Sequence, residues 1–180
     1  MIERNSFQRL RLLCMALALL LALGACSNPF GVEPDEPLLW TPEESYEVTI
    51  EGGRAWATIP YIFTNATGKT VYVVGCGWPT LEKRVAEGWL PVWTNRLCAG
   101  VLGPPMVIEA GAIYSDTLFF ETDRVSSPLP GAAGITPGAT YRLRWTRVFH
   151  NYDPDRRLDF GDPLPEAQRV SSPFTLRLAE

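Results

Sequence analysis

The chain of 180 residues contains a single histidine, and its arginines and lysines form no basic stripe. It also has no Cys-x-x-Cys pair and no Gly-x-Ser-x-Gly motif. These absences argue against nucleic-acid binding, against redox-active thiols and against the serine nucleophile of α/β-hydrolases. No set of base, nucleophile and oxyanion donor can be assembled, so the sequence predicts a protein that is not an enzyme and needs no cofactor.

The most informative feature that is present is an apolar run over residues 12–23. A membrane-spanning helix needs roughly 20 apolar residues, so this run is short for that purpose. Its length fits the apolar region of a signal peptide, and the residues in front of it carry the positive charge that such a peptide has. Those residues are Arg4, Arg9 and Arg11.

The residues at the end of this run, Leu23-Gly24-Ala25-Cys26, resemble the bacterial lipoprotein box. The resemblance implies a lipoprotein signal peptide over residues 1–25, a diacylated Cys26 at the mature N-terminus, and a lipid anchor in a membrane of the cell envelope. An ordinary secretory signal that is cut after Ala25 is the alternative. Ser27 lacks the acidic side chain associated with retention in the inner membrane, which favours the outer membrane or its periplasmic face.

Removal of residues 1–25 takes away three arginines and one glutamate, and this changes the net charge from −4 to −6. The next stretch, residues 26–45, is rich in proline and in acidic side chains. It is expected to be a flexible tether behind the acylated cysteine. The remaining residues, 46–180, fit one folded domain with ample apolar side chains for a core.

Short apolar stretches separated by glycine and proline turns predict an all-β domain. In residues 141–145 the alternation is strict, so the odd-numbered side chains should be buried while Arg142 and Arg144 face solvent. Pro60 predicts an edge position or a bulge for its strand. The other expected strands cover residues 46–50, 55–65, 70–74, 81–85, 89–93, 107–108, 113–121 and 174–178.

Two hairpins are expected among these strands. The turn Asn65-Ala66-Thr67-Gly68-Lys69 should join the strand before it to the strand at residues 70–74. The shorter turn Ala86-Glu87-Gly88 should pair residues 81–85 with residues 89–93.

Several turn sequences of this chain occur together in a known family. Gly138-Ala139-Thr140-Tyr141 resembles the tyrosine corner of immunoglobulin-like domains. Together with five further segments, which are given below, it makes residues 46–178 resemble the intracellular proteinase inhibitor-like domain. The resemblance implies an immunoglobulin-like antiparallel β-sandwich of about seven to nine strands, after an N-terminal signal helix. The other segments are Thr64–Val71, the hairpin that ends in Trp93, Ile108–Gly111, Thr136-Pro137 and Ser172–Phe174.

Cys76 and Cys98 remain as a pair once Cys14 leaves with the signal and Cys26 carries lipid. In an exported protein a disulfide is the default state of such a pair. A bridge over this loop would stabilise the fold by roughly 3 kcal/mol through the reduced entropy of the unfolded chain. The other interpretation, a reactive thiol, lacks an obvious histidine base.

The only histidine, His150, lies at the start of an acidic stretch. Oxygen ligands at alternating positions suit a hard cation such as calcium, but the closing glutamate is missing and Pro154 interrupts the series. We therefore expect a solvated loop without a metal ion. The acidic side chains in question are Asp153, Asp155, Asp159 and Asp162.

Trp78, Trp89 and Trp93 flank the expected disulfide. Such rings either fill a core or form an exposed patch that binds a peptide or glycan. We take them as the candidate binding patch of an envelope lipoprotein with a non-catalytic binding or structural domain. Its expected partners are the membrane, through the lipid, and an envelope protein or peptide, with no nucleic acid. Protease inhibition is the alternative function.

Overall fold

The computed structural model describes residues 37–75, 77–94, 104–122, 134–153 and 160–180, which all lie in the unit Val32–Glu180. These residues form an all-β fold, and their one helical turn is the 3-10 helix η2 (Glu166–Arg169). The strands are β1 (Leu39–Trp40), β2 (Ser45–Glu51), β3 (Arg54–Thr64), β4 (Val71–Val73), β5 (Thr80–Val85), β6 (Gly88–Trp93), β7 (Met106–Ile108), β8 (Ile113–Thr122), β9 (Thr140–Arg144), β10 (Val148–Phe149) and β11 (Phe174–Leu178).

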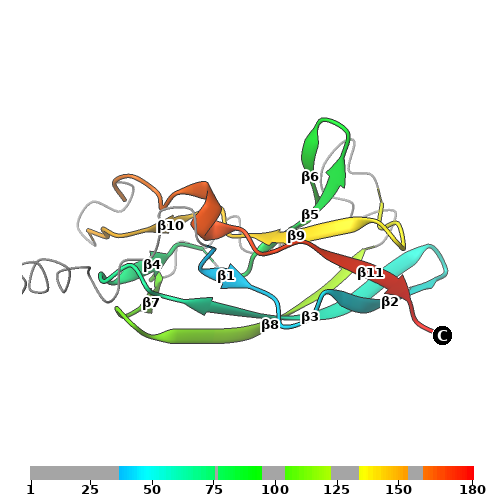
Figure 1. Ribbon diagram of the computed structural model, residues 1–180, viewed down its shortest axis with the longest axis horizontal. Helices are drawn as coiled ribbons and strands as arrows, with labels where there is room; N and C mark the ends of the chain where they lie inside the picture. The colour runs from blue at the N-terminus through cyan, green and yellow to red at the C-terminus, as the bar shows by residue number, and fades with distance from the viewer. Residues whose placement is uncertain (1–36, 76, 95–103, 123–133, 154–159) are drawn as a thin grey trace, which may run out of the picture. The chain divides into compact units, whose positions relative to one another are not determined.

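Eight of these strands share one sheet in the order β1-β3-β2-β11-β9-β5-β6, with β8 also paired to β3. The lower layer in Figure 1 contains β8, β3 and β2, and the upper layer contains β9 and β5. Strand β11 joins the layers, because it pairs in parallel with β2 and antiparallel with β9. The parallel pair differs from the expectation of a wholly antiparallel sandwich. The second sheet has the order β10-β4-β7.

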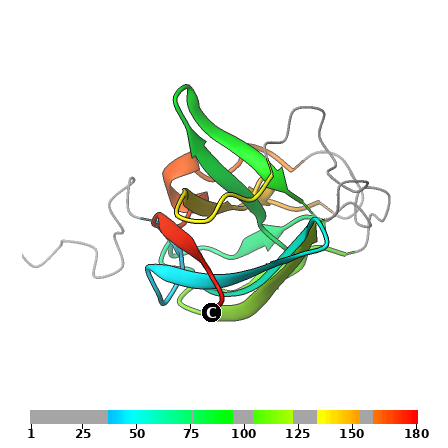
Figure 2. The ribbon, with the colours of Figure 1, turned by 90° about the vertical axis from the view of Figure 1, so that its right-hand side faces the viewer.

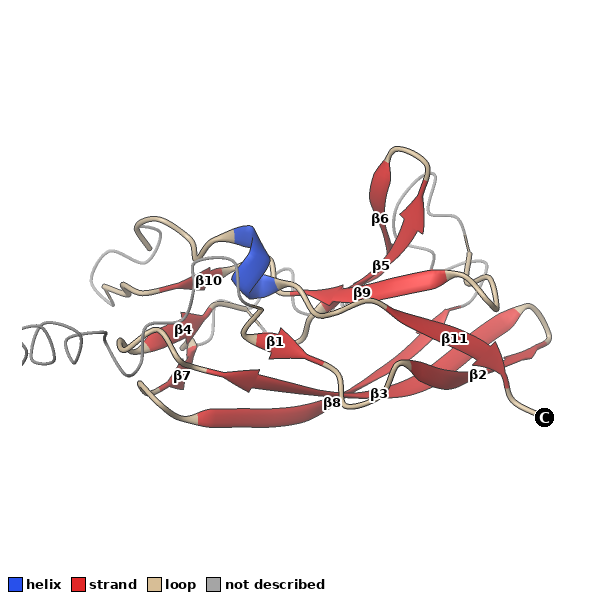
Figure 3. Cartoon of the chain, viewed as in Figure 1, coloured by secondary structure: helices blue, strands red, loops and turns tan. Residues whose placement is uncertain are grey.

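The hairpin of β5 and β6 projects away from the upper layer in two perpendicular views (Figures 1 and 2). It confirms the predicted pairing across Ala86-Glu87-Gly88, with Val85 opposite Gly88. Gly88 has a φ of 135°, a conformation that strongly favours glycine and lets the chain reverse in so few residues. The cartoon in Figure 3 separates the strands of this hairpin from the loops and from η2.

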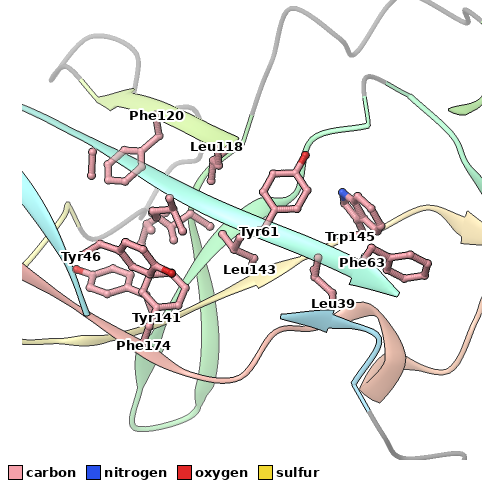
Figure 4. Close-up of a cluster of buried hydrophobic side chains, with 14 of the residues drawn as sticks. Leu39, Tyr46, Tyr61, Phe63, Leu118, Phe120, Tyr141, Leu143, Trp145 and Phe174 are labelled. Carbon is pink, nitrogen blue, oxygen red and sulfur yellow. The ribbon is translucent and has the colours of Figure 1, made fainter. Parts of the chain in front are cut away.

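The core lies between the two layers and is built from the alternating side chains of β3, β8 and β9. On β3 the inward side chains Tyr61 and Phe63 are fully buried, as the alternation predicted. They meet Trp145, which is 1% exposed and whose ring centroid lies 4.9 Å from that of Phe63. Figure 4 shows these rings together with Leu39, Tyr46, Leu118, Phe120, Tyr141, Leu143 and Phe174.

The predicted hairpin between β3 and β4 is wrong. Strand β3 pairs with β8, whereas β4 pairs with β7 and β10 in the other sheet. The turn between them leads the chain from the sheet of β3 to the sheet of β4. It does so because the fully buried Asn65 bonds to backbone carbonyls that are distant in the sequence. Its Nδ2 donates to the carbonyl of Ile108 at 2.8 Å and to that of Glu109 at 3.0 Å, as well as to Lys69 at 2.8 Å.

Pro60 was expected at an edge or a bulge, but β3 is an interior strand. It pairs with β8 along its length, and on its other side with β2 and then β1. The pairs with β2 end at Ala57 and those with β1 begin at Ile62. Pro60 therefore lies where β3 changes partner, and its missing N–H leaves no ladder bond unmade there.

The fold begins earlier than the expected domain boundary at residue 46. Leu38 is 3% exposed and Leu39 is fully buried, and β1 pairs with β3 through Leu39 opposite Phe63. Both leucines lie in the segment expected to be a tether. The folded part thus includes the apolar side chains that follow Pro37.

Candidate functional site

The three tryptophans of the predicted patch have different surroundings. Trp93 packs on the core, where its Nε1 donates to the Glu121 carbonyl at 3.2 Å. The ring of Trp89 lies under the Arg142 guanidinium at 4.5 Å. Trp78 is 49% exposed. No ring contact among the described residues joins two of these three, so the structure does not bring them together.

Arg142 and Arg144 do not form the solvated face that the alternation predicted. The Arg142 side chain is 12% exposed, and its Nε donates to Glu82 Oε2 at 2.7 Å. The Nη1 of Arg144 donates to the other carboxylate oxygen of Glu82 at 3.3 Å, and the Glu82 side chain is 2% exposed. Two guanidinium groups therefore share one buried carboxylate. Glu166 on η2 also bonds to Arg142, at 3.2 Å, but its side chain is 55% exposed.

The remaining predicted site residues are only partly described. Cys26, Cys76, Cys98, Asp155 and Asp159 lie outside the described residues, so the acylation and the disulfide stay predictions. His150 is half-buried, and its Nδ1 lies 3.5 Å from the carbonyl of Thr70. Within the described segments no three histidine, cysteine or acidic side chains are placed to hold a metal ion.

Aromatic rings pack around the segment that follows His150. Tyr152 lies 5.7 Å from Tyr72 of β4 and 5.9 Å from Phe160, which in turn stacks on Phe149 of β10 at 5.1 Å. Phe160 is 7% exposed. Because the rings cover one another, Tyr152 and Phe160 pack on the three-stranded sheet.

The Asp116 carboxylate points inward near the middle of β8. Among the described strands, β8 pairs only with β3. Asp116 Oδ2 accepts hydrogen bonds from the hydroxyls of Tyr114, at 3.0 Å, and Tyr61, at 3.2 Å. Its Oδ1 accepts from the backbone N–H of Thr117 at 2.7 Å. Burial, and next the neighbouring Tyr114 and Asp116, raises the pKa of Tyr61 far above its ordinary value.

This burial of phenols predicts alkaline sensitivity. Burial is the main cause that raises the pKa of each of four tyrosines above the ordinary value of 10.0. The unfolded chain therefore loses these protons first, so stability should be intact below pH 10 and fall as the pH rises further. Absorbance at 295 nm and circular dichroism should change together. Ionisation of these phenols near pH 10 with a native spectrum would contradict this prediction. The four residues are Tyr46, Tyr61, Tyr114 and Tyr141.

On β3 and β8 the outer face of the lower layer carries exposed apolar side chains and no charge from Thr58 to Thr64 and from Ile113 to Phe119, whereas β2 beside them carries the exposed Glu47. Ile113 is 69% exposed, Phe119 56% and Trp40 39%. The cross-strand pairs place them beside hydroxyl-bearing residues and Pro60, since Thr64 lies opposite Ile113 and Thr58 opposite Phe119. We call this surface the uncharged face. It consists of Trp40, Thr58, Pro60, Ile62, Thr64, Ile113, Ser115, Thr117 and Phe119.

Charged groups begin at one end of the uncharged face, near the β2–β3 turn. Arg54 Nη1 lies 3.3 Å from Glu121 Oε1 in an exposed ion pair. Together with Glu51, Trp56 and Phe119 these residues line a shallow depression of about 530 Å³. The depression marks the boundary between the uncharged face and the charged end of the sheet.

The sequence contains a signal for this face that lies outside the motifs described above. The expected strands at residues 55–65 and 113–121 each have an outward set of side chains, and from Thr58 to Thr64 and from Ile113 to Phe119 neither set includes a charge. That these two sets lie side by side depends on the pairing of β3 with β8, which only the structure shows.

Comparisons with known proteins supply no relative for this chain. No family model matches it, and neither curated proteins nor solved structures include a match. Among the described residues there is no helix long and apolar enough to cross a membrane.

Proposed function

We propose that this chain is a lipid-anchored protein of the cell envelope whose β-sandwich domain has a non-catalytic binding role. The uncharged face is the observation that carries the binding role. Exposed large apolar side chains that share one sheet face, here Trp40, Ile113 and Phe119, are typical of sites of contact with proteins or membranes. The lipoprotein box Leu23-Gly24-Ala25-Cys26 supports the anchor, and the outer membrane or its periplasmic face is the proposed location.

An immunoglobulin-like arrangement of the strands belongs to this proposal. It is supported by β11, which is parallel to β2 of the lower layer and antiparallel to β9 of the upper layer and so joins the two layers. It is also supported by Tyr141, whose hydroxyl donates to the Thr136 carbonyl at 2.9 Å and accepts from the Thr136 N–H at 2.8 Å. A phenol bonded back to upstream backbone is the geometry of a tyrosine corner.

Replacing Cys26 with serine tests the anchor. The thiol is the group that is alkylated, so Cys26→Ser should leave an uncleaved or soluble chain, whereas Cys14→Ser should be processed normally. Mass spectrometry of the mature N-terminus in the native host measures the outcome. An unmodified Cys26 in the wild-type protein, or cleavage at another position, would contradict the anchor.

A photo-crosslinking amino acid at Thr117, in the uncharged face, tests the binding role. In the native envelope it should form adducts, with a protein or with lipid, because the face is in contact with its partner. The control position is Glu87, at the exposed tip of the β5–β6 hairpin. Adducts of equal yield at both positions, or none at Thr117, would contradict binding through this face.

Inhibition of a protease is the second candidate function. The projecting β5–β6 hairpin favours it, because an inhibitor presents a rigid exposed segment to the protease. Steady-state assays of envelope proteases with the purified protein measure this directly. Inhibition that is lost when Ala86 and Glu87 are both replaced by glycine, and kept in Thr117→Lys, would favour the inhibitor.

A further inference from the structure

We propose that the uncharged face lies on the lipid surface of the membrane that holds the Cys26 anchor. This inference rests on the proposed function, and it names the partner of the face as lipid. Three observations support it: the place where the tether enters the fold, the absence of charge on the face, and the kinds of side chain that it exposes.

The tether enters the fold at the edge strand β1, whose Trp40 belongs to this face. Trp40 of β1 is part of the face and pairs with Ile62, and only residues 27–37 separate Cys26 from the first buried side chain, Leu38. At about 3.3 to 3.6 Å per residue, these residues reach no more than about 40 Å, whatever their conformation. The lipid anchor thus keeps the domain, and this face with it, within reach of the bilayer, where a weak individual affinity is enough for docking.

The side chains of the face suit the interface between lipid and water. Tryptophan is enriched at this interface because its ring is apolar and its N–H is polar. Ile113 and Phe119 supply apolar area, and the hydroxyls of the threonines can hydrogen bond to headgroups or water. The nine residues of the face include no charged side chain, so docking on lipid would not remove a charge of the face from water. The charged groups at Glu51, Arg54 and Glu121 lie beyond one end.

Lipid fits the face better than a second copy of the chain or another protein. The mature chain has a net charge of −6, so two copies repel one another, whereas a zwitterionic bilayer surface does not oppose approach. Arginine, the charged residue that protein interfaces favour, is absent from the nine residues of the face. Docking should therefore be strongest on zwitterionic lipid and weaken as anionic lipid is added at low salt.

Quenching of tryptophan fluorescence by brominated lipid tests this proposal on the full lipidated protein. The protein is reconstituted in phosphatidylcholine vesicles with ordinary or brominated acyl chains. We expect the wild type to be quenched, Trp40→Phe to lose part of the quenched signal because Trp56 lies beside Phe119 as well, and Ile113→Lys to reduce quenching at least twofold. Val107→Lys is the matched control, because Val107 is a 50% exposed apolar side chain on the other sheet. It should behave as the wild type.

Flotation of the same vesicles distinguishes a failure of the lipid anchor from a failure of the contact between the uncharged face and lipid. Protein that fails to float with the vesicles has no working anchor, which overturns the proposed function itself. Protein that floats but is not quenched, or is affected equally by Ile113→Lys and Val107→Lys, overturns the lipid contact alone. Adducts at Thr117 that contain only another protein, or only a second copy of this chain, also overturn the lipid contact while the binding role stands.

Discussion

Replacing Glu82 with glutamine should lower the free energy of unfolding by about 3 kcal/mol. The Glu82 carboxylate is almost fully buried and lies between the guanidinium groups of Arg142 and Arg144. Glutamine keeps the size and one acceptor, but it leaves the two guanidinium groups with only the exposed Glu166 as counter-charge. Removal of one member of a buried ion pair is costly because the remaining charge has lost both water and partner.

Urea unfolding measures this effect, and Glu166→Gln is its control. Glu166 bonds to the same Arg142 guanidinium, but its side chain is 55% exposed. Solvent screens such a pair, so this substitution should cost less than about 1 kcal/mol. Equal losses in the two variants would show that the burial of Glu82 does not determine the strength of the network.

The second large effect is expected from Trp145→Ala, which should cost about 4 kcal/mol. The ring is 1% exposed and lies against Phe63, Tyr61 and Tyr114 at centroid distances of 4.9, 5.9 and 6.1 Å. Its Nε1 donates to the Gly77 carbonyl at 2.9 Å. Alanine would leave a cavity in the centre of the core and remove that hydrogen bond.

Trp78→Ala is the matched control, because Trp78 is 49% exposed and should lose less than about 1 kcal/mol. If Trp145→Ala does not fold, Trp145→Phe provides the measurement. Its loss in the free energy of unfolding should be measurable but smaller than about 4 kcal/mol, because phenylalanine fills part of the cavity. The midpoint of thermal unfolding reports all three variants. A loss for Trp145→Phe no larger than that for Trp78→Ala would contradict the central place of this ring.

The strands that alternate strictly were predictable because alternation is a local property. The burial of Tyr141 and Leu143 on β9, of Trp145 directly after it, and of Tyr61 and Phe63 on β3 followed directly from it. The β5–β6 hairpin was predictable for the same reason, since its turn and both strands are adjacent in the sequence.

The errors concern partners that are distant in the sequence. The turn at Asn65 resembles a hairpin turn, yet its amide binds the backbone of Ile108 and Glu109 and so directs the chain to the other sheet. Arg142 alternates like a solvated side chain, but its carboxylate partner is Glu82, on another strand. The uncharged face could not be predicted for the same reason, because it needs the register of β3 and β8.

The parallel pair of β2 and β11 has a consequence for the order in which the chain acquires its structure. Ser45 pairs with Thr175, so the contact that joins the layers closes a loop of most of the domain. Local units such as the β5–β6 hairpin can form as soon as they are synthesised, whereas contacts between such distant segments form slowly. Until β11 is in place, no strand pairs with both β2 and β9, so the inner faces of both layers stay open to water.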